Sequence, residues 1–302
     1  MKKLTLEELL RKSKEVTYAD IKREIGMTRK TAKSKIQELR EKGVPIKAYL
    51  DEEYITHFYL QKSPESNLES YATNLHDGNY VLGFTGDWHT GSKYFDEDSL
   101  GKYFDECDDR GVLYMLHTGD IIDGVDVFRG QQVELSIHTK MEQAEYVRDV
   151  LPSLTSGETL FITGNHDLKH LENSFDPGVI IDAKPHYTYL GQIARDVEIG
   201  GLDFRLIHLK GQAYARGYGI QKYLRGLTPN EMPDLLLRGH NHQAMFMLAQ
   251  GVYCFETGTF QKGISNFVKE HGMAGKVSAW IVEVNIENGK LAKLKQELLV
   301  YD

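Results

Sequence analysis

Apolar residues near the start of the chain recur at helical spacing in three short blocks. Spacings of three and four place such residues along one face of a helix, the pattern of a helix that packs on a core. The blocks are Leu6 with Leu9 and Leu10, Ile21 with Ile25, and Ala32 with Ile36 and Leu39. The pattern therefore predicts three short amphipathic helices.

Capping residues mark the ends of these helices. A threonine followed three residues later by an acid has the spacing of a capping box, and a glycine after the last apolar position is a common helix stop. The starts are marked by Thr5 with Glu8, by Thr17 with Asp20, and by Thr28, and the stops by Gly26 and Gly43. The boundaries agree with the apolar spacing.

The chain then changes pattern twice before residue 80. Val44–Leu60 is rich in β-branched and aromatic residues around an acidic turn at residues 51–53, which predicts a two-stranded wing. Residues 61–79 contain Ser-Pro, Ser-Asn and Asp-Gly pairs, which are typical of a connector. We therefore predict a small domain over residues 1–60, a linker over 61–79 and a second domain over 80–302.

From Tyr80 onward, short apolar runs alternate with helical stretches. The runs cover residues 80–85, 112–116, 160–163, 204–207 and 235–237, and the helical stretches cover 98–109 and 137–150. This alternation predicts an α/β body whose chemistry lies at the ends of strands. Segments 243–256, 277–285 and 291–300 are predicted to be antiparallel strands.

Composition excludes several classes of protein. The 302 residues are 41% hydrophobic and 26% charged, as in ordinary globular proteins. No apolar run approaches the ~18 residues of a membrane span. Two cysteines, Cys107 and Cys254, are too few for a disulfide framework or a cysteine-rich zinc site. We expect a cytoplasmic protein with no membrane association.

Charge is distributed unevenly along the chain. Residues 1–47 hold 14 Lys and Arg against 7 Asp and Glu, whereas the remainder holds 22 against 37. A basic domain on an acidic body favours a polyanionic partner for the basic part. The acidic body, if it handles phosphates, must obtain positive charge from another source.

Five polar clusters follow the predicted strands of the body. They are Asp87-Trp88-His89, Gly119-Asp120-Ile121-Ile122-Asp123, Gly164-Asn165-His166-Asp167, His208, and Gly239-His240-Asn241-His242. Side chains two apart on an extended segment point the same way, so we expect Asp87 and His89 to reach one metal together. By the same geometry, His240 and His242 would serve two adjacent metals. Imidazoles, carboxylates and an amide oxygen suit Mn, Fe or Zn better than Mg or Ca.

This ordered set resembles the calcineurin-like metallophosphoesterase superfamily, whose motifs D-x-H, GD-x-x-D, GNH-D/E, a lone H and GH-x-H all occur here in order. The resemblance covers about residues 80–260. It implies a four-layer α/β/β/α sandwich for the body, preceded by the small N-terminal domain. It also implies two divalent ions, with Mn as the first choice and Fe or Zn as alternatives, that supply an activated water and clamp the phosphoryl oxygens.

The resemblance implies a role for each residue. One metal would be held by Asp87, His89, Asp120 and His242, and the other by Asp120, Asn165, His208 and His240. His166 would lie near the leaving group as general acid or transition-state stabiliser, and Asp123 would orient it. Trp88 is expected to pack beneath the metal loop.

The other histidines are expected to be structural or surface residues, as isolated histidines usually are. This interpretation covers His57, His76, His138, His186 and His271. His117 and His170 stand close to the clusters and remain ambiguous, and we place neither in the ligand set.

Residues 1–60 resemble a winged helix-turn-helix, from the spacing of the helices, the short turn at residues 26–28 and the wing. The third helix would then be the recognition helix. Its predicted outward residues are Arg29, Lys30, Lys33, Ser34 and Gln37. Binding to DNA is the first interpretation, and a protein-interaction or dimerisation module is the alternative.

Together these features predict a metal-dependent phosphodiesterase or nuclease that acts on DNA and is tethered by the winged helix. Asp87-Trp88-His89-Thr90-Gly91 resembles the D-x-H-L-G of the double-strand-break repair nuclease subunit, but Thr90 replaces the usual Leu and Asp123 stands where that subunit often has His. We also see no long C-terminal region for a coiled-coil ATPase, so that partner is not predicted. A homodimer remains open.

Two other functions remain as alternatives. One is a phosphomonoesterase or a small-nucleotide phosphodiesterase, including one for cyclic nucleotides. Within that class, protein Ser/Thr phosphatases carry Arg where this chain has Gly124, which counts against them. The other is a DNA-binding regulator whose body senses a nucleotide, and the complete ligand set argues against it.

Overall fold

The computed structural model describes residues 4–13, 16–41, 46–50, 55–60, 70–171, 175–209, 217–262 and 275–301. The chain divides into two compact units, one of residues 1–67 with 225–232 and one of residues 68–224 with 233–302. We call the first the head and the second the body. Among the described residues, none of the helices has both the length and the apolar character that crossing a bilayer requires.

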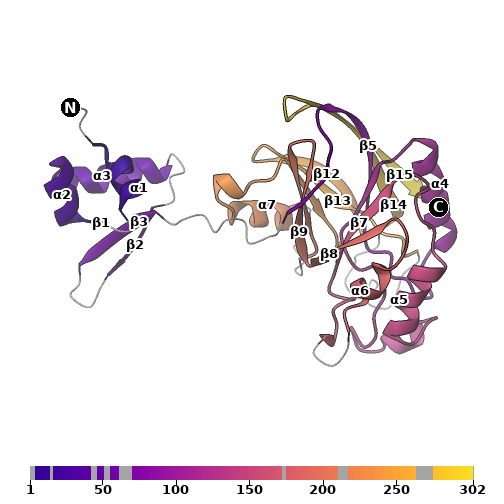
Figure 1. The fold of residues 1–302 in the computed structure, drawn as a ribbon. Helices are drawn as coiled ribbons and strands as arrows, with labels where there is room; N and C mark the ends of the chain where they lie inside the picture. The colour runs from indigo at the N-terminus through magenta and orange to yellow at the C-terminus, as the bar shows by residue number, and fades with distance from the viewer. Residues whose placement is uncertain are drawn as a thin grey trace. The chain divides into compact units, whose positions relative to one another are not determined.

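The head consists of three helices and a small antiparallel sheet with the strand order β1-β3-β2 (Figure 1). Its elements are α1 (Leu6–Lys12), β1 (Val16–Thr17), α2 (Tyr18–Ile25), α3 (Arg29–Glu41), β2 (Ile46–Leu50) and β3 (Thr56–Leu60). The sheet contains the predicted two-stranded wing and adds β1, which pairs with β3. The architecture confirms the predicted winged helix-turn-helix.

Local sequence explains the helix boundaries of the head. Both predicted capping boxes form, at Thr5 and at Thr17. Gly26 ends α2 with φ of 72°, a left-handed conformation that glycine adopts without strain. The predicted apolar faces pack into one core of Leu6, Leu9, Leu10, Ile21, Ala32, Ile36 and Leu39 with residues of the sheet. The predicted stop at Gly43 and the turn at residues 51–53 lie outside the described residues.

The body contains two six-stranded sheets. Their strand orders are β15-β14-β5-β6-β7-β8 and β12-β13-β11-β10-β9-β4. The first sheet comprises β5 (Gly78–Thr85), β6 (Tyr114–His117), β7 (Glu158–Thr163), β8 (Tyr187–Gln192), β14 (Val277–Glu287) and β15 (Lys290–Tyr301). The second comprises β4 (Ser70–Ala72), β9 (Ala194–Ile199), β10 (Leu202–Ile207), β11 (Leu235–Arg238), β12 (Ala244–Ala249) and β13 (Val252–Thr257).

Helices cover the outer faces of the two sheets and complete four layers. They are α4 (Glu97–Asp109), α5 (Lys140–Asp149), α6 (Pro177–Ile181) and α7 (Tyr218–Arg225), with the short 3-10 helix η1 (Gln131–Glu134). Another 3-10 helix, η3 (Pro229–Glu231), belongs to the head. In Figure 1, α4 and α5 lie on one side of the strands and α7 on the other. The predicted α/β/β/α sandwich is thereby confirmed.

Two apolar cores hold the layers together. One lies between the sheets and includes Phe84, Leu116, Phe204 and Phe255, which come from strands of both sheets. The other lies beneath α4 and α5 and includes Trp88, Leu100 and Val147. Because both faces of the central strands are buried, these strands are continuous apolar runs, and the runs were visible in the sequence.

Parallel pairing explains why the polar clusters meet. Strands β5, β6, β7 and β8 are parallel neighbours, as are β10 and β11, so the loops after them leave the same edge of each sheet. The segment predicted as a linker is only partly a connector, because Ser70–Ala72 forms β4 and pairs with β9. Residues 61–69 lie outside the described part.

Candidate metal centre

Three groups of ligating side chains gather at these strand ends, and within each group the ligand atoms lie within 4.8 Å of one another. The groups are Asp87 with His89 and His242, Asp120 with His208 and His240, and His89 with Asp123 and His166. The first two groups contain all the predicted metal ligands except Asn165. That these groups hold one metal each stays a prediction.

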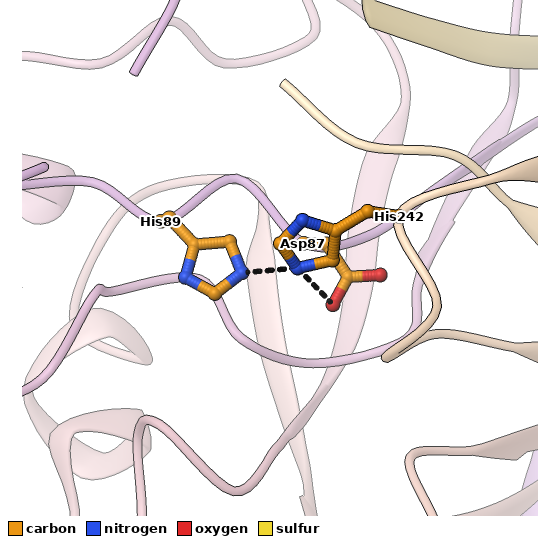
Figure 2. Close-up of side chains that lie close together, drawn as sticks. All are labelled: Asp87, His89 and His242. Atoms are coloured by element: carbon orange, nitrogen blue, oxygen red, sulfur yellow. Dashed lines mark hydrogen bonds and ion pairs between the residues drawn. The ribbon is translucent and has the colours of Figure 1, made fainter. Parts of the chain in front are cut away.

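The first group joins the loop after β5 to the loop after β11 (Figure 2). The Nε2 atoms of His89 and His242 lie 2.8 Å apart, and Asp87 Oδ1 lies 3.8 Å from His242 Nε2. Both oxygens of Asp87 accept the backbone N–H of His240, at 3.0 and 2.8 Å. The three side chains therefore point at one small volume.

The second group is centred on Asp120, which is 1% exposed. Asp120 Oδ2 lies 3.0 Å from His208 Nε2 and 4.0 Å from His89 Nε2, so the carboxylate stands between the two groups. The other ring nitrogen of His208 contacts the carbonyl oxygen of Thr118 at 2.7 Å. A carbonyl can only accept, so His208 Nδ1 carries a proton, and its Nε2 is the ring atom that faces the Asp120 carboxylate. This is the position that the predicted bridging ligand requires.

Asn165, in the loop after β7, has an unpaired side-chain oxygen. Its Oδ1 is buried and has no hydrogen-bond partner among the described residues. An orphaned buried acceptor is uncommon in a folded protein and is satisfied when it ligates a cation. Together with the carboxylates and imidazoles, this oxygen fits a pair of divalent ions.

Burial favours the neutral imidazole at His89, His240 and His242, whereas burial of His208 is opposed by the charge on Asp120, which raises the pKa of His208 to about 9. Burial lowers the pKa of His240 to about 3, with the charge on His208 adding to the effect. Burial likewise lowers the pKa of His89 and of His242. Burial opposes ionisation of Asp120, but the charge on His208 holds the pKa of this carboxyl well below its usual range. Neutral imidazole and ionised carboxylate are the forms that bind metal.

The backbone of the ligand loops is strained. Asp87, His89, Asp120, His240 and His242 have positive φ values of 50°, 54°, 56°, 85° and 53°. Residues other than glycine rarely adopt this conformation, which costs on the order of 1–3 kcal/mol and concentrates at functional sites. The expected extended geometry around Asp87 and His89 is therefore wrong, because β5 ends at Thr85 and the ligands lie on a tight turn.

Asp123 contacts His89 in addition to His166, the residue that it was expected to orient. Its Oδ1 contacts His89 Nδ1 at 2.9 Å and lies 3.7 Å from His166 Nδ1. His166 Nδ1 instead contacts the main-chain carbonyl oxygen of Asp123 at 2.8 Å. The carboxylate thus orients His89, whose Nε2 faces the metal site, and the backbone of the same residue orients His166.

Asp167 was not singled out from the sequence as a functional residue. Its buried carboxylate accepts the backbone N–H groups of Gly164 and Asp120 at 2.7 and 2.8 Å, and those of Ile121 and Ile122 at 3.3 and 2.9 Å. It therefore ties the loop after β6 to the loop after β7. Its place at the end of the GNH-D motif was the available signal.

Gly164 allows these two loops to approach. A Cβ at this position would lie 2.3 Å from Asp120 Oδ1 and 2.8 Å from His208 Cδ2. Neither neighbour can move away without displacing a predicted ligand. The absence of a side chain at Gly164 is a steric requirement of the centre.

Trp88 and the histidines outside the ligand set were also given predicted positions. Trp88 is fully buried, with its ring 4.5 Å from that of His117, which confirms packing beneath the metal loop. His117 Nδ1 accepts the N–H of Gly119 and lies outside the three groups, as does His170 on the surface. His76, His138 and His186 are exposed and His57 is half-buried, whereas His271 lies outside the described residues.

The predicted recognition helix exposes the residues named for it. Arg29, Lys30, Lys33, Ser34 and Gln37 are all exposed, and Ala32, Ile36 and Leu39 face the core. The Arg29 guanidinium lies 4.9 Å from the centroid of the Tyr18 ring, a cation–π distance. Contact of these residues with DNA stays a prediction.

Comparison with known families agrees with the geometry of both parts. The family model of the calcineurin-like phosphoesterases matches residues 80–244, more than half of the chain and all seven predicted ligands. The chain belongs to the calcineurin-like phosphoesterase family. A second family model, of an HTH domain, matches residues 2–49.

Curated relatives of this calcineurin-like phosphoesterase include DNA polymerase II small subunits of archaea. The subunit of Methanothermobacter thermautotrophicus is 25% identical over 229 residues, which are 60% of this chain and 48% of the relative. The subunit of Pyrococcus furiosus is 26% identical over 255 residues, which are 69% of this chain and 41% of the relative. The chain thus spans about half the length, or less, of these relatives.

The solved structures that match this chain include an archaeal phosphodiesterase and a hypothetical protein of Pyrococcus horikoshii. The phosphodiesterase is 15% identical with a TM-score of 0.38, covering 72% of this chain and 99% of its own. The P. horikoshii protein is 10% identical with a TM-score of 0.44, and the match covers 74% of this chain and 89% of that protein.

Proposed function

We propose that this protein is a metal-dependent phosphodiesterase that hydrolyses DNA and is held on its substrate by the head. The observation that carries the proposal is the convergence of six ligating residues on two adjacent groups, with Asp120 of the second group 4.0 Å from His89 of the first. The basic head supports DNA as the substrate, and so does the name of the curated relatives as DNA polymerase subunits.

Each residue of the centre has a part in this proposal. One divalent ion would be held by Asp87, His89, Asp120 and His242, and the other by Asp120, Asn165, His208 and His240. When bound, such a pair supplies an activated water and positive charge on the phosphoryl oxygens, with Mn²⁺ as the first candidate and Fe or Zn as alternatives.

His166 is the proposed acid for the leaving oxygen. Its side chain is 16% exposed, in contrast to the fully buried His208, so a substrate can reach it. The carbonyl oxygen of Asp123 accepts its Nδ1–H and thereby leaves Nε2 to face outward. The backbone N–H of His166 also donates to Asp120 Oδ1 at 2.8 Å, which couples the position of the acid to that of the bridging carboxylate.

The alternatives differ in substrate or in turnover. A phosphomonoesterase or small-nucleotide phosphodiesterase needs the same centre and gains nothing from the basic head. A DNA-binding regulator with a nucleotide-sensing body needs no turnover. Such a regulator would not require the complete set of predicted metal ligands. A cytoplasmic location and a homodimer stay predictions.

One side-by-side assay separates these functions. The full-length protein with Mn²⁺ is given single- and double-stranded DNA, cyclic nucleotides, a phosphomonoester and bis(p-nitrophenyl) phosphate. We expect hydrolysis of DNA and of the nitrophenyl diester. Faster turnover of the monoester or of a cyclic nucleotide than of DNA would move the first alternative into the leading place, and binding of DNA without turnover of any substrate would favour the regulator.

The control for this assay is Asp120→Asn, which keeps the size of the side chain and removes its charge. Metal content and hydrolysis of every substrate should fall together, because the carboxylate stands between both groups. Activity that persists in Asp120→Asn comes from a contaminating nuclease or from another site.

A further inference from the structure

Gln131, in the 3-10 helix η1, is a buried amide that the proposed chemistry does not use. Its side chain is 1% exposed. Its Nε2 donates two hydrogen bonds, to the main-chain oxygen of Asp123 at 2.8 Å and to Asp123 Oδ2 at 2.9 Å. Its Oε1 accepts the N–H of Val127 at 2.8 Å. All the hydrogen-bonding capacity of the amide nitrogen is thus directed at one residue.

The partners fix the orientation of this amide. An ionised carboxylate and a carbonyl accept hydrogen bonds only, and a backbone N–H donates only, so Nε2 must face Asp123 and Oε1 must face Val127. One planar group therefore holds the side chain and the main chain of Asp123 at once. Rotation of the Asp123 carboxylate would break a hydrogen bond to Gln131 in the interior, where its replacement by water is not available.

The two oxygen positions that Gln131 holds lead to two different histidines. The Asp123 carboxylate contacts His89 Nδ1 through Oδ1, and the Asp123 carbonyl contacts His166 Nδ1. A donor hydrogen on Nδ1 places the lone pair of His89 on Nε2, the atom that lies 2.8 Å from His242 Nε2. The chain of contacts Gln131–Asp123–His89 thus ends at the first metal group.

We propose that Gln131 is a positioning residue that fixes Asp123, and through it His89, for metal binding at the group of Asp87, His89 and His242. The second metal group is less directly linked to this network, because His208 is oriented by the carbonyl oxygen of Thr118 and Asp120 is reached only through the backbone N–H of His166. Loss of the Gln131 amide should therefore weaken the first metal site more than the second. This inference rests on the proposed two-metal function.

The test is a calorimetric titration of MnCl₂ into full-length protein freed of metal with a chelator. Gln131→Met keeps the length of the side chain and removes its donor and its acceptor. Gln131→Glu keeps the acceptor for Val127, removes the donor and places a second carboxyl group against that of Asp123. It serves as the second variant if the methionine protein does not fold. The control is Gln132→Met, the same change at the next residue, whose exposed amide bonds only Asp126 Oδ1 among the described residues.

We expect two binding steps in the wild-type protein and in Gln132→Met. In Gln131→Met and Gln131→Glu, one step should weaken by about 10- to 100-fold, the usual effect of removing a group that orients a metal ligand, while the other step changes much less. Two unchanged steps in the Gln131 variants overturn the role of Gln131 alone. An equal loss of both steps together with a lower unfolding midpoint also overturns it, because the role is then merely structural.

A wild-type protein that binds fewer than two Mn²⁺ gives a different result. It refutes the proposed two-metal function itself, and the role of Gln131 with it. The two failures are thus distinguished by the behaviour of the wild-type chain.

Discussion

Replacement of Gly164 by Ala directly tests how closely the loop after β6 approaches the loop after β7. The added Cβ would lie 2.3 Å from Asp120 Oδ1 and 2.7 Å from the backbone nitrogen of Asp120, whereas ordinary contacts are 3.4–4 Å. The loop after β7 must therefore move by about 1 Å relative to the loop after β6. Because a backbone atom is involved, a change of side-chain rotamer cannot relieve the clash.

The expected magnitudes follow from this displacement. An extra methyl group in a close-packed site costs ~1–3 kcal/mol of unfolding free energy. For a domain of this size, each kcal/mol lowers the melting temperature by about 2–4 °C. A shift of about 1 Å between catalytic groups costs on the order of 100-fold in rate. Weaker binding of Mn²⁺ should accompany the loss of rate, since Asp120 and His208 both border the added methyl group.

Gly101→Ala is the matched control, because it makes the same chemical change inside helix α4. A Cβ at Gly101 meets no atom within 4 Å. Alanine is favoured over glycine in a helix interior, so this variant should gain about 0.5–1 kcal/mol. The change from glycine to alanine should thus lower the unfolding free energy at Gly164 and raise it at Gly101.

Urea unfolding followed by tryptophan fluorescence reports the body alone. The two tryptophans of the chain, Trp88 and Trp280, both lie there and are both buried. A chelator keeps metal binding from adding to the stability of either variant. If Gly164→Ala matched Gly101→Ala in stability and also kept the wild-type rate, the close approach of the loops would be refuted.

Three further predictions concern the centre and the head. Asp120→Asn should lose both metals and the hydrolysis of any substrate, measured by elemental analysis and by turnover of the nitrophenyl diester; two retained metals with a near-normal rate contradict the bridging position. His166→Ala should retain both metals and lose ~10²–10⁴-fold in turnover. That loss should shrink for substrates with good leaving groups, and an equal loss across leaving groups excludes proton donation. Changing Arg29, Lys30 and Lys33 together to Ala should weaken DNA binding and flatten its salt dependence, since each phosphate contact contributes about −0.9 to the log–log slope. Hydrolysis of a small diester should be unchanged in that variant, and an unaltered salt slope identifies the head as an interaction module.

The sequence by itself determined the local elements and the residue types of the centre. Capping threonines and Gly26 set the helices of the head through bonds within four residues of one another. The buried strands were visible as apolar runs, because a strand covered on both faces has no polar side to interrupt it. The clusters that contain Asp87, Asp120, Asn165, His208 and His240 were visible because each follows such a strand.

Only the tertiary structure decided which residues meet and in what geometry. His89 and His242 are 153 positions apart and His89 and Asp123 are 34 apart, so their contacts depend on strand order and loop path. The positive φ values of Asp87 and His89, the pairing of the Asp123 carboxylate with His89, and the hydrogen bonds of Asp167 and Gln131 all follow from that packing. A carboxylate or an amide looks the same in the sequence whether it faces water or a buried N–H, and the fold alone supplies its partner.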